Sequence, residues 1–310
     1  NIVSGQTLSV TGSGTVASAN VGTGKNVTSV NLALANGTGS ASNYSINSFT
    51  AEITGRPVTI SGSRLYDSTT TASNSILTIT SGVTGESLSL TGSGVLGAAS
   101  AGTQTITNNN TLAIADGSGL ASNYTLSGAT INVTIIPRTL NATLSRKYDG
   151  TTSVSGALLT PVFDSLQGGE TLALSGTGSV SSANVGSSKS VSLGSIALAP
   201  GSGNPSNYTL NSATMDITPR VINLDGIRAF DGTTNVLSSD INTFGNIVSG
   251  ETLTISGVGS VGTNSVAMNK VITTGSLSLG NGSGLAGNYT LTGGTHTFDI
   301  SPVSVNVTGS

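Results

Sequence analysis

The chain has 310 residues, of which 43 are glycine, 7% are charged and none is cysteine, and its formal net charge is −3. Ten Lys and Arg with thirteen Asp and Glu cannot cover the outer faces of long solvated helices. An apolar content of 35% with so small a net charge also argues against disorder. Composition therefore predicts an ordered protein that is almost entirely β.

The same counts limit the chemistry. Without Cys the chain has no thiol nucleophile, disulfide or cysteine-based metal site, and the single His296 supplies at most one imidazole. The cations form no basic patch for nucleic acid, and no apolar run has the length of a membrane-spanning helix. We expect no catalytic residue and no cofactor, and therefore no enzyme. We also expect no nucleic-acid partner and no membrane insertion in this segment.

A repeat of about eighty residues organises the chain, and each unit closes at or near a proline. We expect a partial unit at residues 1–56, complete units at 57–137, 138–219 and 220–302, and the first strand of a following unit at 303–310. The opening residues Asn1 to Gly5 match Asn246 to Gly250 one for one. The pattern is therefore that of an excised stretch of a longer array.

Strands inside each unit are predicted from alternating polar and apolar residues, as in 58–60, 87–90, 171–174 and 303–307. Glycine-rich turns separate them, for example at 116–119 and 281–284. This spacing predicts a tandem array of small antiparallel β-sandwich (Ig-like) modules forming an elongated rod. The alternative is a right-handed β-helix, whose coils would repeat every ~20 residues instead.

The clearest recurring motif is an aromatic residue followed by Asp and Gly or Ser and then two threonines. Its aromatic residue would anchor each unit, and its Asp would cap a local turn. An Arg three residues before each Asp suggests a repeated ion pair, against the alternative of a solvated charge at a strand end. The residues of this predicted structural turn are Tyr66, Asp67, Tyr148, Asp149, Gly150, Phe230, Asp231 and Gly232.

The motif Tyr148-Asp149-Gly150-Thr151-Thr152, repeated in a chain rich in Gly, Ser, Thr and Asn, resembles the YDG-domain repeats of filamentous-haemagglutinin-type bacterial surface adhesins. Ser68 replaces the Gly in the first complete unit, and Phe230 replaces the Tyr in the third. The resemblance implies a secreted protein at the bacterial cell surface. It also implies a stalk without catalytic residues. We expect its partners to be neighbouring repeats of the same chain, with other copies of the chain as partners if the stalk assembles into a fibre.

Two alternative functions remain open at this stage. The repeats could bind carbohydrate or a host or matrix protein directly, with exposed tyrosines stacking on the ligand. They could also polymerise head to tail, because the strand at 303–310 could add to the partial unit of another copy. The tyrosines in question are those of the recurring Asn-Tyr pair, Tyr44, Tyr124, Tyr208 and Tyr289.

Three kinds of modification or ion site are also suggested by recurring residues. The Asn of each Asn-Tyr pair is a sequon for glycan attachment: Asn43, Asn123, Asn207 and Asn288. Glu52, Asp216 and Asp299 lie near unit boundaries, with Asn132 in the fourth place, and could bind calcium there. Lys25, Lys189 and Lys270 recur at one position, as for isopeptide cross-links, although Gln104 interrupts the series.

Overall fold

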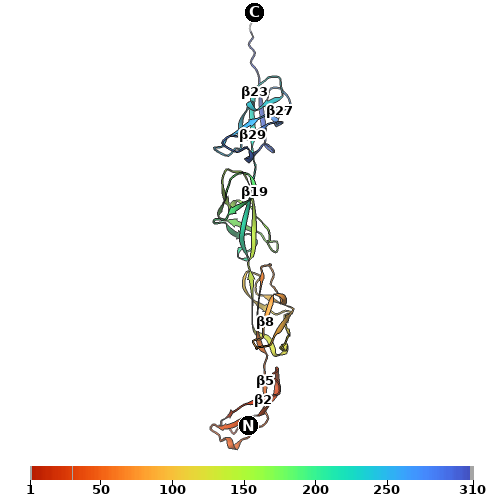
Figure 1. Ribbon diagram of the computed structural model, residues 1–310, viewed down its shortest axis with the longest axis vertical. Coiled ribbons are helices and arrows are strands. Elements are labelled where there is room, and N and C mark those ends of the chain that lie inside the picture. Colours follow the sequence, from red (N-terminus) through yellow and green to blue (C-terminus); the bar gives the residue numbers. More distant parts are fainter. Residues whose placement is uncertain (1, 30, 308–310) are drawn as a thin grey trace. The chain divides into compact units, whose positions relative to one another are not determined.

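The computed structural model describes residues 2–29 and 31–307 and divides into two compact units, residues 1–137 and 138–310. The two units are taken separately below. The prediction of an all-β protein is confirmed: the described residues form strands and short 3-10 turns, and no α-helix is found among them (Figure 1). None of the helical segments in these residues has the length and apolarity needed to cross a membrane.

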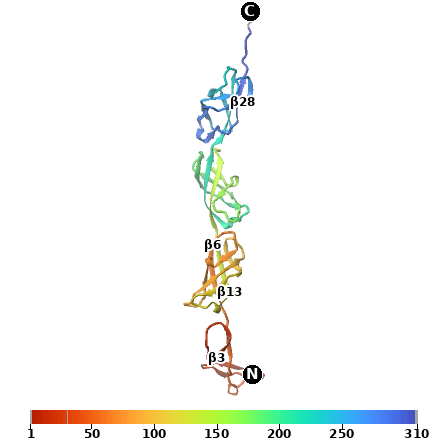
Figure 2. The same ribbon diagram turned by 90° about the vertical axis from the view of Figure 1, so that its right-hand side faces the viewer.

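The complete repeat of the first unit contains eight strands. They are β6 (Arg56–Leu65), β7 (Thr71–Ser73), β8 (Leu77–Thr80), β9 (Leu88–Thr91), β10 (Ser93–Leu96), β11 (Gly102–Asn108), β12 (Ala113–Asp116) and β13 (Tyr124–Ile136). Six of them form a curled sheet in the order β7-β10-β11-β13-β6-β8, and β9 pairs with β12 in a separate two-stranded sheet. Figure 2 shows β6 and β13 in this repeat.

The second unit repeats this plan twice. Its first repeat comprises β14 (Arg138–Lys147), β15 (Ser153–Ser155), β16 (Val162–Phe163), β17 (Leu172–Ser175), β18 (Thr177–Val180), β19 (Gly186–Ser192), β20 (Ala197–Pro200) and β21 (Tyr208–Thr218). Its second comprises β22 (Arg220–Val221), β23 (Asn223–Ala229), β24 (Asn235–Leu237), β25 (Ile241–Gly245), β26 (Leu253–Ser256), β27 (Val258–Val261), β28 (Ala267–Thr273), β29 (Ser278–Asn281), β30 (Tyr289–Thr290) and β31 (His296–Ser301).

One feature of the sheets differs from the predicted antiparallel sandwich. The opening and closing strands of each complete repeat are parallel neighbours. These are β6 with β13, β14 with β21, and, in the 220–302 repeat where both strands are divided, β22 with β30 and β23 with β31. The prediction of purely antiparallel modules is therefore wrong, although all other pairings in the 138–219 repeat are antiparallel. Because the two strands run the same way, the chain comes into each repeat at one pole and leaves it at the opposite pole.

The partial repeat at the start of the chain is built from five strands, β1 (Leu8–Thr11), β2 (Gly14–Val16), β3 (Gly22–Ser29), β4 (Ala33–Asn36) and β5 (Thr50–Ile53). Its larger sheet has the order β2-β3-β5. In the complete repeats the strand equivalent to β5 has a parallel first strand on its other side. Here that side of β5 has no strand partner among the described residues.

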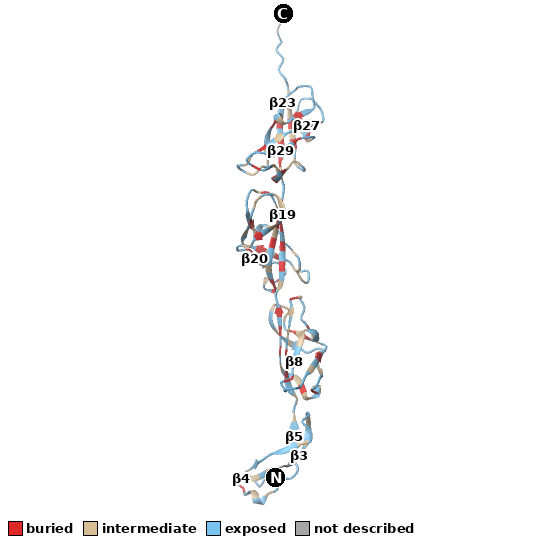
Figure 3. Ribbon diagram, viewed as in Figure 1, coloured by how far each residue is buried: buried red, intermediate tan, exposed pale blue. Residues whose placement is uncertain are grey.

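A hydrophobic core fills each complete repeat, and the red residues of Figure 3 mark its position. In the second unit the core is one continuous cluster that includes residues of both repeats, from Ala142 to Ile300. Leu140, Leu144, Met215 and Phe298 are at most 1% exposed. The alternation of these residues with exposed polar ones follows the period of two expected for strands.

The expected unit boundaries can be compared with the strand ends. Pro137 and Pro219 fall between strands, whereas Pro57 is the second residue of β6. Residues 302–307 continue past β31 without strand pairing, and residues 308–310 of the expected strand lie outside the described residues. The alternative of a right-handed β-helix is wrong, because the sheets within a repeat are mixed and mainly antiparallel.

Candidate functional site at the joint between repeats

The recurring turn forms in all three complete repeats with the same contacts. In the second of these, Asp149 Oδ1 accepts hydrogen bonds from the backbone N–H and the hydroxyl of Thr151, at 2.9 and 3.0 Å. Arg146 Nη1 pairs with Asp149 Oδ2 at 2.6 Å, and its side chain is only 12% exposed. Equivalent ion pairs join Arg64 to Asp67, and Arg228 to Asp231.

These buried arginines are part of the repeat rather than solvated charges. Arg228 lies over the ring of Phe298, with its guanidinium carbon 5.5 Å from the ring centroid. Arg146 also donates to the carbonyl of Ser153 at 2.8 Å. The turn thus brings residues three apart into contact, which an extended strand would place on opposite faces. The backbone N–H of Thr233 lowers the pKa of Asp231 at the equivalent turn.

The aromatic residue of the turn reaches into the next repeat. The Tyr148 hydroxyl donates to Glu251 Oε1 at 2.6 Å, across 103 residues of sequence. The Tyr289 hydroxyl donates to the other carboxylate oxygen, Oε2, at 2.7 Å. The two rings meet edge to face with centroids 5.4 Å apart, an arrangement that contributes about 0.5–1.5 kcal/mol beyond area burial. One carboxylate therefore joins two repeats through two phenols.

Burial gives this contact its strength. Tyr148 is 4% exposed and Tyr289 is 5% exposed. Burial and then the hydrogen bond to Glu251 raise the pKa of Tyr289 to about 12, and the same two causes raise the pKa of Tyr148. Both phenols are therefore neutral donors at neutral pH, and hydrogen bonds to a charged acceptor contribute about 1.5–3 kcal/mol each.

Gly150 of the turn also faces the next repeat. Its φ is +77°, and a Cβ added to it would lie 2.9 Å from Cγ1 of Val248. A side chain here would therefore meet both backbone strain and the neighbouring repeat. At the equivalent Gly232, with φ +80°, an added Cβ would have no heavy atom within 4 Å.

The Asn of the Asn-Tyr pair makes the second contact across the joint. Asn288 Oδ1 accepts from the backbone N–H of Val185 at 2.9 Å, and its Nδ2 donates to Asn184 Oδ1 at 3.0 Å. The first unit contains the same pair of bonds. There Asn123 binds Val21 N–H and Asn20 Oδ1, both at 2.9 Å.

Arg220 lies where the chain passes from one repeat to the next, and its guanidinium group contacts both repeats. Its Nε and Nη2 donate to the carbonyl and side-chain oxygens of Asn246 at 2.6 and 2.8 Å, and its Nη1 reaches the carbonyl of Tyr148 at 3.4 Å. Asn246 in turn donates to the carbonyl of Val221 at 2.6 Å. The joint thus combines aromatic, carboxylate, amide and guanidinium contacts around a short connection.

The structure places most residues of the recurring Asn-Tyr pairs inside the repeats. Tyr124, Tyr208 and Tyr289 are 5–9% exposed, and Tyr44 is half-buried, whereas ligand stacking would require exposed rings. Among the expected glycan acceptors, Asn207 and Asn288 are 4% and 3% exposed and Asn43 is exposed. Ligand stacking and glycan attachment at these residues stay predictions.

The predicted ion and cross-link sites also have other contacts. The carboxylates of Asp216 and Asp299 accept backbone N–H groups of Ser188 and Asn269, at 2.6 and 2.7 Å. Across the residues that the structure describes, no group of three His, Cys, Asp or Glu could hold a metal ion. The Lys270 ammonium donates to the Thr263 hydroxyl at 2.8 Å, a contact with a side chain that cannot form an isopeptide bond.

The single imidazole is a core residue. His296 is 7% exposed, its Nδ1 accepts from the backbone N–H of Leu224 at 3.1 Å, and its Nε2 lies 2.9 Å from the carbonyl of Leu291. These contacts tie the last strand of the repeat to the first. They use both ring nitrogens for structure.

The sequence interpretation missed the joint itself. The sequence pattern gives the aromatic turn and the Asn-Tyr pair separate roles inside each unit, whereas in the structure both lie at one joint. One sequence feature pointed to the joint. Glu251, in Gly250-Glu251-Thr252-Leu253, is a charged residue beside a turn in a chain with few charges. A carboxylate beside a turn is expected to accept a hydrogen bond from a buried donor.

Comparison with known proteins gives one family. The YDG domain matches residues 50–133 and again 132–215, which together make up more than half of the chain. No curated protein and no solved structure matches the chain.

Proposed function

The chain belongs to the YDG-domain family, and we propose that it is a non-catalytic structural repeat region, the stalk or fibre of a secreted bacterial surface adhesin. The observation that carries the proposal is the parallel pairing of first and last strands, which places the two chain ends of each repeat at opposite poles. Repeats connected in this way extend an array rather than fold back on it.

The joint supports the same function. A stalk must resist bending at its connections, and the second unit has a continuous core and a buried, hydrogen-bonded joint between its two repeats. The asparagine contact recurs in the first unit. A flexible string of domains would instead have polar, solvated linkers.

Tension along the array would load the strongest direction of each repeat. A pull on the ends of the 138–219 repeat draws β14 and β21 in opposite directions along their common axis. Ten residue pairs join these strands, so the ladder is sheared as a whole rather than opened one bond at a time. This loading suits a protein that holds an adhesive tip away from a cell.

Small-angle scattering of the 310-residue chain tests the proposed stalk. Strands of about ten residues make each repeat roughly 35 Å long, so a rod of about 140 Å should have a radius of gyration near 40 Å. A globular chain of this length would give about 19 Å. The smaller value would contradict the proposal. Surface exposure is tested separately, by asking whether protease treatment of intact producing cells releases peptides of the chain.

A further inference from the structure

One edge of the 138–219 repeat departs from the plan of the other two complete repeats. Its segment 150–169 is two residues longer than the corresponding segment 68–85 and one residue longer than 232–250. The edge strand within it, β16, has two residues, whereas β8 has four and β25 has five. A difference carried by one repeat of three marks a place where that repeat can do more than extend the array.

A leucine accounts for the displaced edge. At Gly62 and Gly226 an added Cβ would clash with the carbonyl oxygens of Ile76 and Asp240, which precede β8 and β25. Leu144 holds the equivalent position in the 138–219 repeat and is 1% exposed. Because its side chain fills this space, the edge of the sheet cannot approach β14 as closely here, and pairing begins only further along.

The displaced edge leaves a cavity of about 410 Å³ against β14 and β21. Its polar lining includes Asn141, Asp164 and Ser212, and its apolar lining includes Val162 and Phe163. Phe163 is half-buried and also packs against the core, whereas Val162 is 68% exposed. Both the volume, near the lower end of about 300–1,000 Å³, and the mixed lining are typical of small-molecule sites.

The polar groups are held in place by one another. Asp164 Oδ1 accepts from the backbone N–H of Asn141 at 3.1 Å, and its Oδ2 accepts from Asn141 Nδ2 at 2.7 Å. The Ser212 hydroxyl donates to Asn141 Oδ1 at 2.8 Å. The bonds from the backbone and side chain of Asn141 lower the pKa of Asp164. In this arrangement Oδ2 can accept a further hydrogen bond, and Nδ2 can donate one.

An acceptor and a donor side by side, next to an aromatic ring, suit a sugar. One sugar hydroxyl can donate to Asp164 while its neighbour accepts from Asn141, and the apolar face of the sugar ring can contact Phe163. Among the described residues that line the cavity, Asp164 alone is charged, which disfavours an anionic ligand. We propose that this cavity binds an uncharged sugar unit through Asn141, Asp164, Ser212 and Phe163. The inference goes beyond the stalk proposal, which needs no ligand.

The other complete repeats have different residues at these positions. By strand register, Asp164 corresponds to Thr80 and to Gly245, and Phe163 corresponds to Ile79 in the 57–137 repeat. Neither counterpart of Asp164 has a carboxylate. The proposed site therefore belongs to the 138–219 repeat and not to the repeated plan.

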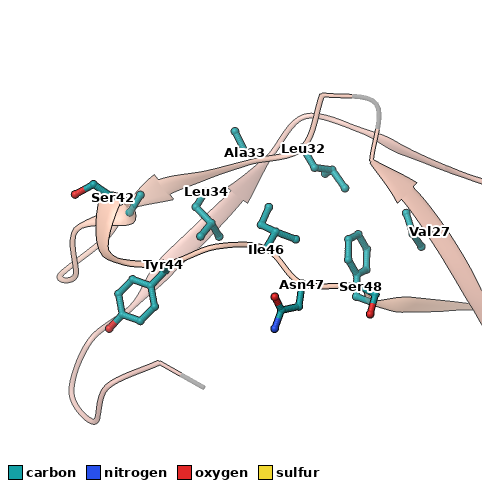
Figure 4. Close-up of a pocket in the computed structure, with 11 residues that line it drawn as sticks. Val27, Leu32, Ala33, Leu34, Ser42, Tyr44, Ile46, Asn47 and Ser48 are labelled. Atoms are coloured by element: carbon teal, nitrogen blue, oxygen red, sulfur yellow. The ribbon is translucent and has the colours of Figure 1, made fainter.

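A cavity of about 640 Å³ in the partial repeat also has a different lining. Figure 4 shows Val27, Leu32, Leu34 and Ile46 around it, and none of the described residues that line it is charged. The pairing of a carboxylate with an amide is thus a particular feature of the 138–219 cavity.

NMR titration of the isotopically labelled 310-residue chain tests the inference. The probes are the methyl glycosides of glucose, galactose, mannose and N-acetylglucosamine, each raised into the high millimolar range. At least one of them should shift the Asn141 side-chain amide and the backbone N–H signals of Asp164 and Ser212, and the shifts should saturate.

Two variants carry residues of the 57–137 repeat and should therefore fold. Asp164→Thr should weaken binding about tenfold or more, because it removes a charged acceptor. Phe163→Ile should also weaken binding, and it leaves the polar network in place. Asp225→Asn is the control, since Asp225 is an exposed carboxylate on β23 of the next repeat, and it should leave the affinity unchanged.

The absence of saturable shifts with all four glycosides would overturn the inference. Unchanged affinity in both Asp164→Thr and Phe163→Ile would overturn it as well. Shifts of the same signals by methylammonium chloride, with none from the glycosides, would identify a cation site instead. An elongated chain in scattering that binds no glycoside would leave the stalk proposal intact while refuting this one.

Discussion

The hydroxyl of Tyr148 and the carboxylate of Glu251 lie 2.6 Å apart across the joint of two repeats. Tyr148 belongs to the motif that recurs most clearly in the sequence, and Glu251 to a different motif of the following repeat. The recurring aromatic residue is therefore a connector between repeats as well as an anchor of its own turn.

Substitution of the pair should show coupled losses. Tyr148→Phe removes one donor from a half-buried carboxylate and should lower the free energy of unfolding by about 1.5–3 kcal/mol. Glu251→Gln should cost a similar amount, but the double variant should lose about 1 kcal/mol less than the sum, since the amide no longer needs the second phenol. Chemical denaturation of the four chains measures the coupling, and strictly additive losses would contradict the contact.

The joint should be sensitive to alkaline pH. Burial and the bond to Glu251 raise the pKa of Tyr289 to about 12, whereas an unfolded tyrosine titrates near 10. A raised phenol pKa stabilises the folded chain fully below about pH 10, and this contribution is lost as pH rises toward about 12. Denaturation midpoints should therefore fall across this interval. The fall in the denaturation midpoint should be smaller in Tyr289→Phe. An equal fall in that variant would show that a group other than Tyr289 causes it.

Gly150→Ala and Gly232→Ala form a matched pair. Both glycines have positive φ, at +77° and +80°, so both variants carry the same backbone strain of about 1 kcal/mol. Only Gly150 faces Val248, 2.9 Å from an added Cβ. Gly150→Ala should therefore lower the thermal midpoint more, and Val248→Ala should relieve the difference. Equal thermal midpoints in the two variants would show that the Val248 side chain moves away from the added methyl group without cost.

Asn288→Ala should destabilise the joint by about 1–3 kcal/mol, because it removes the two hydrogen bonds that the buried amide makes with the Val185 N–H and the Asn184 side chain. Asn43→Ala is the control, since Asn43 holds the same position in its motif and is exposed. Hydrogen exchange at Val185 should accelerate in the first variant alone. Protection that persists in Asn288→Ala would refute the assigned acceptor.

Mechanical unfolding should distinguish two repeats of the same chain. Ten pairs join β14 to β21 along their length, whereas the corresponding ladder of the 220–302 repeat is divided into two pairs between β22 and β30 and six between β23 and β31. The 220–302 repeat should therefore unfold at lower force when the chain is stretched from its ends. The reverse order would show that the parallel ladder does not bear the load.

The sequence supported the all-β class and the period of about eighty residues, because both follow from composition and local pattern. It could not reveal the parallel pairing of first and last strands. Alternation at β14 and β21 fixes which face of each strand is buried, but it carries no information on the neighbour at a separation of about seventy residues.

The joint between repeats could not be predicted from the sequence for a related reason. Tyr148, Glu251 and Asn288 each have a plausible local role, and their partners lie 103 or 104 residues away. Tyr289 is buried because a phenol next to a turn can lie in a repeat surface that the neighbouring repeat covers. Only the placement of consecutive repeats distinguishes such a residue from a ligand-stacking one.

The central claim is that the recurring residues make a rigid joint between consecutive repeats. Residual dipolar couplings of the aligned 310-residue chain test it most directly. The 138–219 and 220–302 repeats should share one alignment tensor, and Tyr148→Phe combined with Asn288→Ala should separate it into two. Independent tensors in the unaltered chain would contradict the claim.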